Sequence, residues 1–436
     1  MSRRASVALV VLAAARATAN PVDAFGYGAR APAMAGAATA ATDGDSSATY
    51  YNPAALATAD AIRIDLGYQA ASPSLAINGG DQGVDPVHGL VAGAVIPGHI
   101  GRLALAVGVG LQLPDERVLR LRTVPPSQPR WMIYDNRPQR FFLSAGLAVA
   151  VTDDLWVGGG ISYMSRTQGT VDLAGRIGFP RAADSDLRLS IDVDLVAVRY
   201  PNAGILWRPA PWLEVGLSYR GSFALKVDQG FSIHADLGSV TEPVLTGAVL
   251  SLTSVSLDHF QPLELTAGFA ARLSPGLLVA GDLTYAQWSA FENPSAQIVL
   301  VYDLKDFNKF VNLPPPEPLP PALFHDIVIP RLGVEITASR RLTIRAGYSF
   351  EPSPAPEQRG VTNFVDNDKH TLAAGLGVRV FGLGAIVPRP LDIDVFVADT
   401  ILPERGHRKL SVVDPVGDYV SGGHVLSGGL ETRWRF

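Results

Sequence analysis

Apolar and polar residues alternate with a period of two along most of the chain beyond residue 60. Between residues 61 and 70, every second position carries a large apolar side chain: Ile62, Ile64, Leu66 and Tyr68. Successive side chains of a strand point to opposite faces, whereas a helix repeats every 3.6 residues. The same alternation recurs in 101–113, 263–272 and 342–349. The pattern predicts an all-β protein.

Fourteen candidate strands follow from this alternation, most of them longer than ordinary strands. They cover residues 61–72, 88–97, 101–113, 140–151, 155–168, 190–207, 212–225, 261–273, 277–289, 327–337, 341–351, 369–381, 390–400 and 424–436. Strands of about 10 residues suit an oblique crossing of a bilayer.

Long and short connections alternate between these strands. The gaps after odd-numbered strands are long, including 73–87, 169–189, 226–260 and 290–326, whereas most gaps after even-numbered strands hold only three or four residues. An even strand number with tight turns at one end is the arrangement of a transmembrane β-barrel. A soluble propeller is the alternative, but it would not alternate its gaps so regularly. We therefore predict a fourteen-stranded antiparallel transmembrane barrel spanning 61–436.

Composition narrows the function. Only 18% of the 436 residues are charged, below the usual quarter, and no apolar run is long enough for a spanning helix. The absence of cysteine excludes a disulfide scaffold and a cysteine-ligated metal site. A net charge of −5 gives no nucleic-acid footprint. We expect no metal site, no cofactor and no nucleic-acid partner.

The first 19 residues have the pattern of an export signal. Arg3 and Arg4 precede the apolar stretch 5–15, and Ala17-Thr18-Ala19 is an A-x-A cleavage site. We expect cleavage after Ala19, so that the protein leaves the cytoplasm.

The inward face of the predicted strands holds isolated charges among small residues. Arg102, Arg331 and Arg345 are candidates for binding a carboxylate, since arginine pairs with carboxylates in a bidentate way. Pairing with lumen acids is the alternative role for each of them.

Two long connections have unusual compositions. Val244, Leu245, Val249 and Leu250 form an apolar stretch in 226–260 that could line an external ligand groove or pack against neighbouring loops. Residues 313–321 are rich in proline and are expected to form a stiff polyproline segment.

Residues 20–60 do not alternate. Glycine, alanine and small polar residues dominate there, so this prefix could fold into the barrel lumen as a plug. At the other end of the chain, Phe436 closes an alternating strand, and this resembles the signal by which the barrel-assembly machinery recognises outer-membrane barrels.

Several motifs together resemble the FadL/TodX family of outer-membrane transporters. In the prefix they are Gly28-Ala29-Arg30-Ala31, Met34-Ala35-Gly36-Ala37, Ala41-Thr42-Asp43-Gly44-Asp45 and Tyr51-Asn52-Pro53-Ala54-Ala55-Leu56. Farther along, 282–289 ends in Trp288-Ser289, and Arg345-Ala346-Gly347-Tyr348 runs into a proline-containing loop. The resemblance covers nearly the whole chain after residue 19.

The resemblance implies a bacterial outer-membrane barrel closed by an N-terminal hatch, residues 20–60. It would conduct long-chain fatty acids or aromatic hydrocarbons passively, in contact with outer-membrane lipid and lipopolysaccharide. We expect gating to involve Asp43, Gly44 and Asn52-Pro53-Ala54, where proline fixes φ and asparagine favours a local turn. Phe25 is a further candidate for ligand contact.

Other functions remain as alternatives. A non-transporting barrel of the same fold could be a secretion shuttle or a surface anchor. A porin for polar solutes is disfavoured by the hatch and by the alanine-rich interior. An enzyme is disfavoured because the sequence has neither a Gly-x-Ser-x-Gly elbow nor a His-Glu-x-x-His helix.

Overall fold

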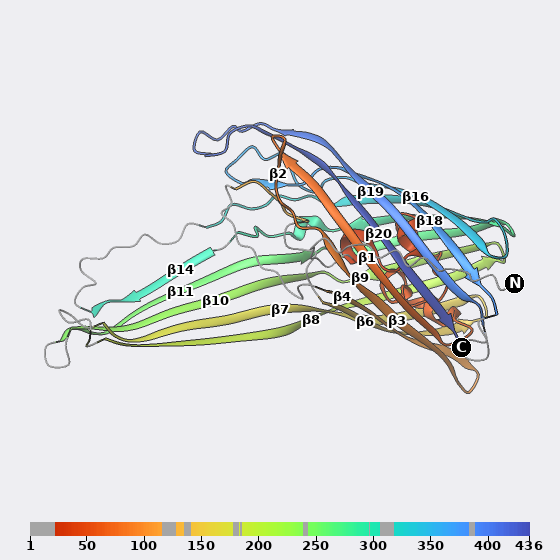
Figure 1. Ribbon diagram of the computed structural model, residues 1–436, viewed down its shortest axis with the longest axis horizontal. Coiled ribbons are helices and arrows are strands. Elements are labelled where there is room, and N and C mark those ends of the chain that lie inside the picture. The colour runs from red at the N-terminus through yellow and green to blue at the C-terminus, as the bar shows by residue number, and fades with distance from the viewer. Residues whose placement is uncertain are drawn as a thin grey trace, which may run out of the picture.

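Fourteen antiparallel strands close into a barrel in the computed structural model (Figure 1). Each barrel strand pairs with the next one along the chain, and β1 closes the ring by pairing with β20. The structure describes residues 22–115, 128–134, 141–177, 183, 185–238, 243–295, 297–305, 318–382 and 389–436. The predicted fold class is confirmed.

All fourteen barrel strands overlap the predicted ones, and their limits agree best at the turn end, whereas several differ by five or more residues at the loop end. They are β1 (Arg63–Ile77), β3 (Val87–Ile100), β4 (Leu103–Pro114), β6 (Phe142–Thr152), β7 (Leu155–Ile177), β8 (Asp186–Ala210), β9 (Leu213–Arg220), β12 (Glu264–Ser274), β13 (Leu277–Ala286), β15 (Ile327–Thr337), β16 (Leu342–Glu351), β18 (Lys369–Val380), β19 (Leu391–His407) and β20 (Tyr419–Arg435). Tight turns join β3 to β4, β6 to β7, β8 to β9, and β12 to β13 at one end. The long connections lie at the opposite, loop end.

Alternation along each strand separates the lipid side from the lumen. In β1, Ile64 and Leu66 are exposed on the outer surface, whereas Arg63, Asp65 and Gln69 are buried on the inner side. Polar side chains are thus enclosed in the lumen, and apolar ones form the outer surface, as a barrel in lipid requires.

Short helical segments fill the lumen, drawn in red inside the barrel in Figure 1. They are α1 (Val22–Phe25), α2 (Arg30–Ala33), α3 (Ala48–Tyr51) and the 3₁₀ helix η1 (Pro53–Thr58). Most side chains between residues 26 and 58 are buried. We call residues 22–60 the hatch segment. None of the helices in the described part of the chain is long and apolar enough to cross a membrane.

Three long connections differ from their prediction as loops. Much of 169–189 is strand, because β7 and β8 continue as one ladder as far as Arg176 and Asp186. The segment 226–260 is a hairpin of β10 (Phe223–Gly238) and β11 (Pro243–Gln261), and 290–326 contains β14 (Gln297–Asp303). These segments alternate in polarity as the spanning strands do, so membrane length alone did not set the strand ends.

Some predictions fall outside the described residues. These include the export signal 1–19 and residues 313–317 of the proline-rich segment, while 318–321 have no regular structure. Two very short pairs, β2 (Gly80–Asp81) with β1 and β5 (Arg130–Trp131) with β17 (Phe364–Val365), order parts of the loop end.

The placement of Arg102 was predicted wrongly. It lies in the exposed turn between β3 and β4 and does not face the lumen. The predicted strand began at Gly101, but β4 begins at Leu103, so the inward and outward alternation does not include Arg102. The chain reverses just before it, at Gly101, where φ is +61°.

The orientation of the barrel can be tested with single cysteines, since the natural chain has none. Val412 is fully exposed at the loop end, and Arg102 is exposed at the turn end. With the loops outside the cell, a membrane-impermeant maleimide should label Val412→Cys in intact cells and Arg102→Cys only after the outer membrane is broken. The unmodified protein is the blank, and the reverse labelling order would contradict the assigned orientation.

Candidate functional site: the hatch-closed lumen

Hatch segment and inner wall meet along a belt of glycines. A Cβ atom added at any of these positions would contact or overlap the hatch segment: Gly93, Gly108, Gly146, Gly158, Gly204, Gly216, Gly268, Gly333, Gly347 and Gly375. We call this set the glycine belt. Its missing side chains make room for the plug, since a closed barrel has little spare lumen once side chains fill it.

Asn52 joins the hatch segment to the wall. Its Oδ1 accepts from the N–H of Ala54 at 3.1 Å and caps η1, with Pro53 at the first helical position. Its Nδ2 donates to the carbonyl oxygen of Thr39 at 2.8 Å and to that of Ile205 in β8 at 3.1 Å. The Asn-Pro-Ala motif is therefore a cap and a wall anchor at once.

Gly44 and Asp43 lie where the hatch segment turns. Gly44 has φ of +66°, and a Cβ there would lie 2.7 Å from Oγ1 of Thr58. The carbonyl oxygen of Asp43 accepts from Arg63 of β1, and its carboxylate lies 3.6 Å from Nη2 of Arg435. Both residues serve the shape and attachment of the hatch segment.

Alternating charges link hatch and wall on one side of the barrel. Glu335 accepts from Arg30 at 2.8 Å and from Arg345 at 2.7 Å, and Arg345 also donates to Asp394 at 2.5 Å. The chain of charges then continues through Arg433 of β20 back to the hatch.

Arg433 completes this chain. It donates to Asp394 at 2.6 Å and to Asp45 of the hatch segment at 3.0 Å. We call Arg30, Glu335, Arg345, Asp394, Arg433 and Asp45 the ionic chain. All six residues are largely buried, and such charges are stable only when paired. Arg345, a predicted ligand contact, is held inside this chain.

Wall carboxylates also accept from hatch backbone N–H groups. Asp282 accepts from Ala38 and Thr39 at 2.9 and 3.0 Å. Asp65 accepts from Ser46, and Glu431 accepts from Ala29. On the opposite side, Leu56 of η1 is fully buried among residues of β4, β6, β7 and β8. Charged contacts are thus concentrated on one side of the hatch segment, whereas η1 packs against the wall on the other.

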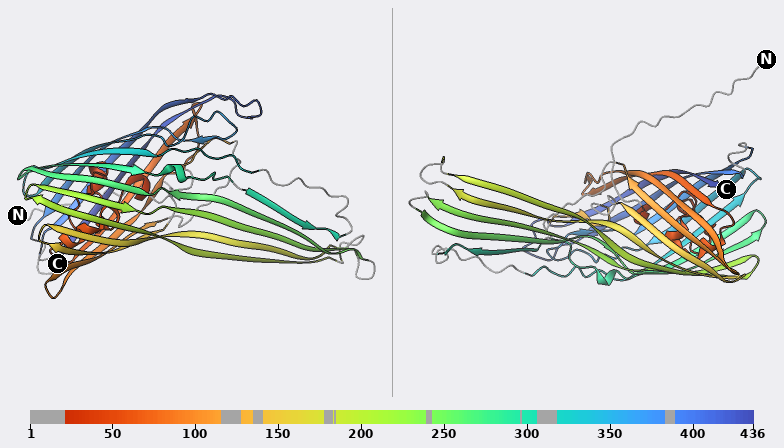
Figure 2. Two further views of the ribbon diagram at one scale, coloured as in Figure 1. Left: turned by 180° about the vertical axis from the view of Figure 1, so that it is seen from behind. Right: turned by 90° about the horizontal axis from the view of Figure 1, so that it is seen from below.

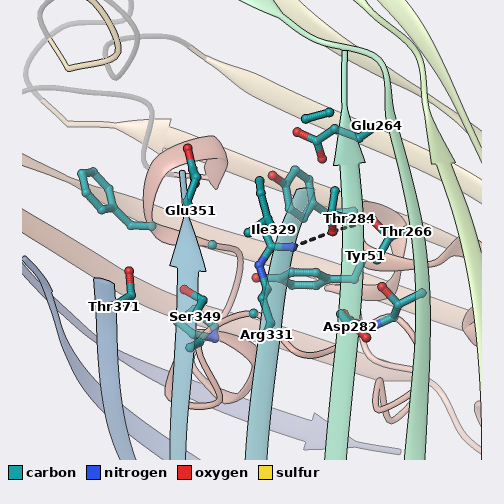
Figure 3. Close-up of a pocket in the computed structure, with 18 of the residues that line it drawn as sticks. Tyr51, Glu264, Thr266, Asp282, Thr284, Ile329, Arg331, Ser349, Glu351 and Thr371 are labelled. Carbon is teal, nitrogen blue, oxygen red and sulfur yellow. Dashed lines mark hydrogen bonds between the residues drawn. The ribbon is translucent and has the colours of Figure 1, made fainter. Parts of the chain in front are cut away.

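A polar cavity lies above the hatch segment, toward the loop end (Figure 3). Its empty space is about 1080 Å³, part of it open to solvent. Arg331 projects into it from β15 and donates to Oγ1 of Thr284 at 2.6 Å. Phe25 and Tyr51 line it from the hatch segment. We call this space the lumen cavity.

An aromatic pocket adjoins the lumen cavity at the loop end. Phe260, Trp288, Phe291 and Phe324 surround it with ring centroids 4.5 to 6.0 Å apart. Its empty space is about 350 Å³. Trp288 lines both spaces, so the two are neighbours across one indole ring.

A third space lies below the hatch segment, toward the turn end. Arg30 and Asp43 of the hatch, Arg345 and the turn residues Ser339 and Arg340 line it. The hatch segment therefore separates this lower cavity from the lumen cavity.

Several predicted ligand contacts lie far from these spaces. Val249 and Leu250 belong to β11 in the part of the hairpin beyond the barrel, and Val244 and Leu245 precede them on the same strand. Their prediction as loop residues was wrong. The structure brings Phe25 and Arg331 together at one cavity and leaves Arg102 and the β11 residues apart from it.

Sequence reasoning missed the aromatic pocket. Its rings come from β11, from η3 (Trp288–Ala290) and from segments without regular structure, so no periodic signal linked them. In the sequence, Trp288-Ser289 indicates only a resemblance to the family and no pocket. The available signal was that Phe260, Phe291 and Phe324 lie at or near the ends of the predicted long loops 226–260 and 290–326.

Asp366 is buried at the loop end. Burial raises the pKa of Asp366, against the opposing effect of Lys369, whose Nζ lies 3.2 Å away. The described residues include no cluster of three or more histidine, aspartate and glutamate side chains suited to a metal ion.

The glycine belt can be tested at Gly347. A Cβ there would lie 2.2 Å from the carbonyl carbon of Met34. Gly347→Val should weaken hatch docking by about 1 to 3 kcal/mol through overpacking. We expect larger single-channel conductance in planar bilayers. Gly406→Val in β19 is the control, because nothing lies within 4 Å of a Cβ at that position. Equal conductance of a correctly folded Gly347→Val and the parent would contradict this role.

Known outer-membrane proteins resemble this chain in sequence. The family model of the outer membrane protein transport proteins (OMPP1/FadL/TodX) matches residues 139–381, more than half of the chain. Alkane uptake protein A of Marinobacter nauticus is 24% identical over 416 residues, which cover 89% of this chain and 86% of that protein.

Two solved structures share the fold. A Pseudomonas aeruginosa FadL homologue superposes with a TM-score of 0.59 at 15% identity, covering 94% of this chain and 98% of its own. The toluene transporter TodX of Pseudomonas putida gives 0.57 at 14%, covering 94% and 99%. With its fourteen-stranded barrel, the chain belongs to the OMPP1/FadL/TodX family of bacterial outer-membrane transport proteins.

Proposed function

We propose that this outer-membrane channel takes up neutral hydrocarbons by passive diffusion. The supporting observation is that Trp288 lines both the aromatic pocket and the lumen cavity. A ligand in the pocket would therefore be one side chain away from the lumen. In this proposal the concentration gradient of the ligand drives its passage, and no coupled reaction supplies energy.

The lining of the aromatic pocket supports a neutral ligand. Among its described lining residues there is no lysine, arginine, aspartate or glutamate, and His259 is the single titratable group. Apolar walls favour an apolar ligand, and a carboxylate would lose its hydration there without a partner. Relatives named for alkane uptake and toluene transport act on neutral hydrocarbons, which agrees with this substrate class.

Fatty acids are the second candidate, and Arg331 is the reason. Its guanidinium projects into the lumen cavity and has Thr284 as its hydrogen-bond partner. A carboxylate that passed the aromatic pocket could pair with it, as arginine does elsewhere. In that case Arg331→Leu should slow oleate uptake and leave toluene uptake unchanged.

The hatch segment is proposed as the gate. Ion pairs of the charged side regain hydration when they separate, which offsets part of the lost attraction, whereas separating η1 from the wall would expose buried apolar surface. We therefore infer that α2 and residues 38–42 move, while η1 stays on the wall through Asn52, Pro53 and Ala54. Asp43 and Gly44 would be the turn about which the movable part shifts.

The entry site can be tested by uptake. The host should be a Gram-negative strain without its own transporter, given labelled toluene, hexadecane or oleate. Trp288→Ala should reduce hydrocarbon uptake at least about tenfold, since an aromatic wall contributes more than 1.4 kcal/mol. Trp207→Ala is the matched control, because that indole is half-exposed on the lipid side. No uptake of any compound by the correctly inserted parent would favour a secretion shuttle or surface anchor.

The gate can be tested by cutting the ionic chain at its hatch end. Arg30→Met leaves Glu335 paired with Arg345, so the wall keeps its charges balanced. We expect opening events in bilayer recordings to rise at least about tenfold, because a hydrogen bond to a charged group contributes about 1.5 to 3 kcal/mol to the docked state. Arg379→Met is the control, since Arg379 pairs with Asp392 of the wall. If both variants opened equally often, the ionic chain would not be a latch.

A further inference from the structure

A five-stranded sheet projects beyond the barrel at the loop end (Figures 1 and 2). Its strand order is β8-β7-β10-β11-β14, with β10 parallel to β7 and all other neighbours antiparallel. A spanning strand needs about 9 to 11 residues, whereas β7 has 23 and β8 has 25. About half of each strand therefore lies outside the membrane.

One face of this sheet is apolar across all five strands. Residues paired directly across strands share a face, and two complete rows can be followed. They are Ile191–Val171–Phe231–Leu252–Leu300 and Leu189–Leu173–Ile233–Leu250–Tyr302. Leu187 and Val193 extend the face along β8. We call these residues the apolar face.

The apolar face is open along its outer strand. The exposed fraction is 53% for Leu187 and 62% for each of Leu189, Ile191 and Val193. The opposite face is mainly polar: Asp172 lies between Ser190 and Ser232 and accepts from the latter's hydroxyl, and Arg176 pairs with Asp236. Its exposed apolar residues are Val299 and Val301, both on the edge strand β14. Across β8, β7 and β10, this opposite face is therefore the one suited to solvent.

The apolar face continues the lipid-facing side of the barrel. In β8, odd-numbered residues such as Ile205 are exposed to lipid, whereas Tyr200 and Asn202 are buried in the lumen. The same odd parity carries Val193 and Leu187, with exposed Arg199 between the two apolar regions. The apolar face is therefore directed sideways, away from the barrel axis. It is separated from the lipid-facing region by Arg199.

Size and composition indicate what could cover this face. At about 3.3 Å per residue and 4.8 Å per strand, the face measures roughly 20 by 20 Å, or ~400 Å². A stable pair of proteins buries about 800 Å² on each partner, twice that footprint. Protein interfaces are also enriched in tryptophan and arginine, whereas the two rows are mainly leucine, isoleucine and valine, as on the lipid-facing wall.

We propose that the apolar face docks on the surface of a liquid hydrocarbon phase outside the cell. This inference rests on the proposed function and adds to it the source of the substrate. Within the membrane, the odd-numbered residues of β8 face the alkyl chains of the lipid. Beyond the membrane, the same parity forms an uncharged aliphatic face, which suits contact with alkyl chains there too. Docking would hold the channel mouth against a droplet, so that uptake would not depend on the small amount of hydrocarbon dissolved in water.

The test compares two triple variants of β8 in intact cells. Leu189→Thr, Ile191→Thr and Val193→Thr together make the β8 part of the apolar face polar, and threonine is a β-branched residue that suits a strand. Arg188→Thr, Ser190→Thr and Asp192→Thr change the opposite face by the same number of residues. The readouts are cell partition onto hexadecane droplets and uptake of dissolved toluene, with surface amount measured by antibody.

We expect the apolar-face variant to lower chain-dependent droplet adhesion at least about tenfold, because three aliphatic side chains lose their burial in the hydrocarbon. Its uptake of dissolved toluene should stay unchanged, and the opposite-face variant should match the parent in both assays. Equal adhesion by parent and both variants would overturn the proposal. Adhesion without toluene uptake in the parent would instead refute the channel and leave this docking role standing.

A second copy of the chain is the competing occupant. Leu189→Cys introduces the sole cysteine of the chain on the apolar face. If the face is free for hydrocarbon, this variant should remain monomeric on oxidising gels of intact cells. A disulfide-linked dimer formed in the absence of hydrocarbon would show that another copy covers the face, and would overturn the proposal.

Discussion

Closure of the sheet by β1 and β20 is the contact on which the rest of the structure depends. Their ladder runs from Arg63 opposite Arg435 to Ile77 opposite Ser421 without an interruption. In lipid an open strand edge would leave backbone groups without partners, so the fold exists only as a complete ring. Because the ring is complete, its interior is sealed from lipid, and charged residues such as Asp65 and Arg433 can be buried there.

The plug uses two different chemistries on its two sides. Toward β13, β15, β16, β19, β20 and β1 it is held by the ionic chain and by the carboxylates of Asp282, Glu431 and Asp65, which accept from its backbone. Toward β4, β6, β7 and β8 it is held mainly by η1, which packs against glycines. The first kind of contact has a specific geometry and can be replaced by water, whereas the second depends on area and excludes water. This asymmetry is what makes one part of the plug a candidate for movement.

Much of the barrel could be predicted from the sequence because lipid imposes a strict alternation on every strand. The limits of β15 at Ile327 and Thr337 match the expected ones, and β16 and β18 differ by a residue. The extension of β7 and β8 could not be separated from loops, since the strand-length rule for membranes does not hold outside them. Arg345 illustrates the limit for the site: its inward parity was predictable, but its partners come from β15 and β19 and depend on the register. The aromatic pocket was out of reach because its rings share no local pattern.

The contrast between the aromatic pocket and the lumen cavity has a kinetic consequence. On the proposed route, a hydrocarbon that left the aromatic pocket would enter a space lined by Thr284, Glu264 and Arg331, where it would be poorly solvated. A channel conducts only when its site binds strongly enough to load and weakly enough to release. The small volume of the aromatic pocket limits its affinity for any one ligand, so release of a bound ligand is favoured over its retention. Flux through such a channel would saturate at the aromatic pocket, and under saturating supply the compounds that fit it best would be the slowest to cross.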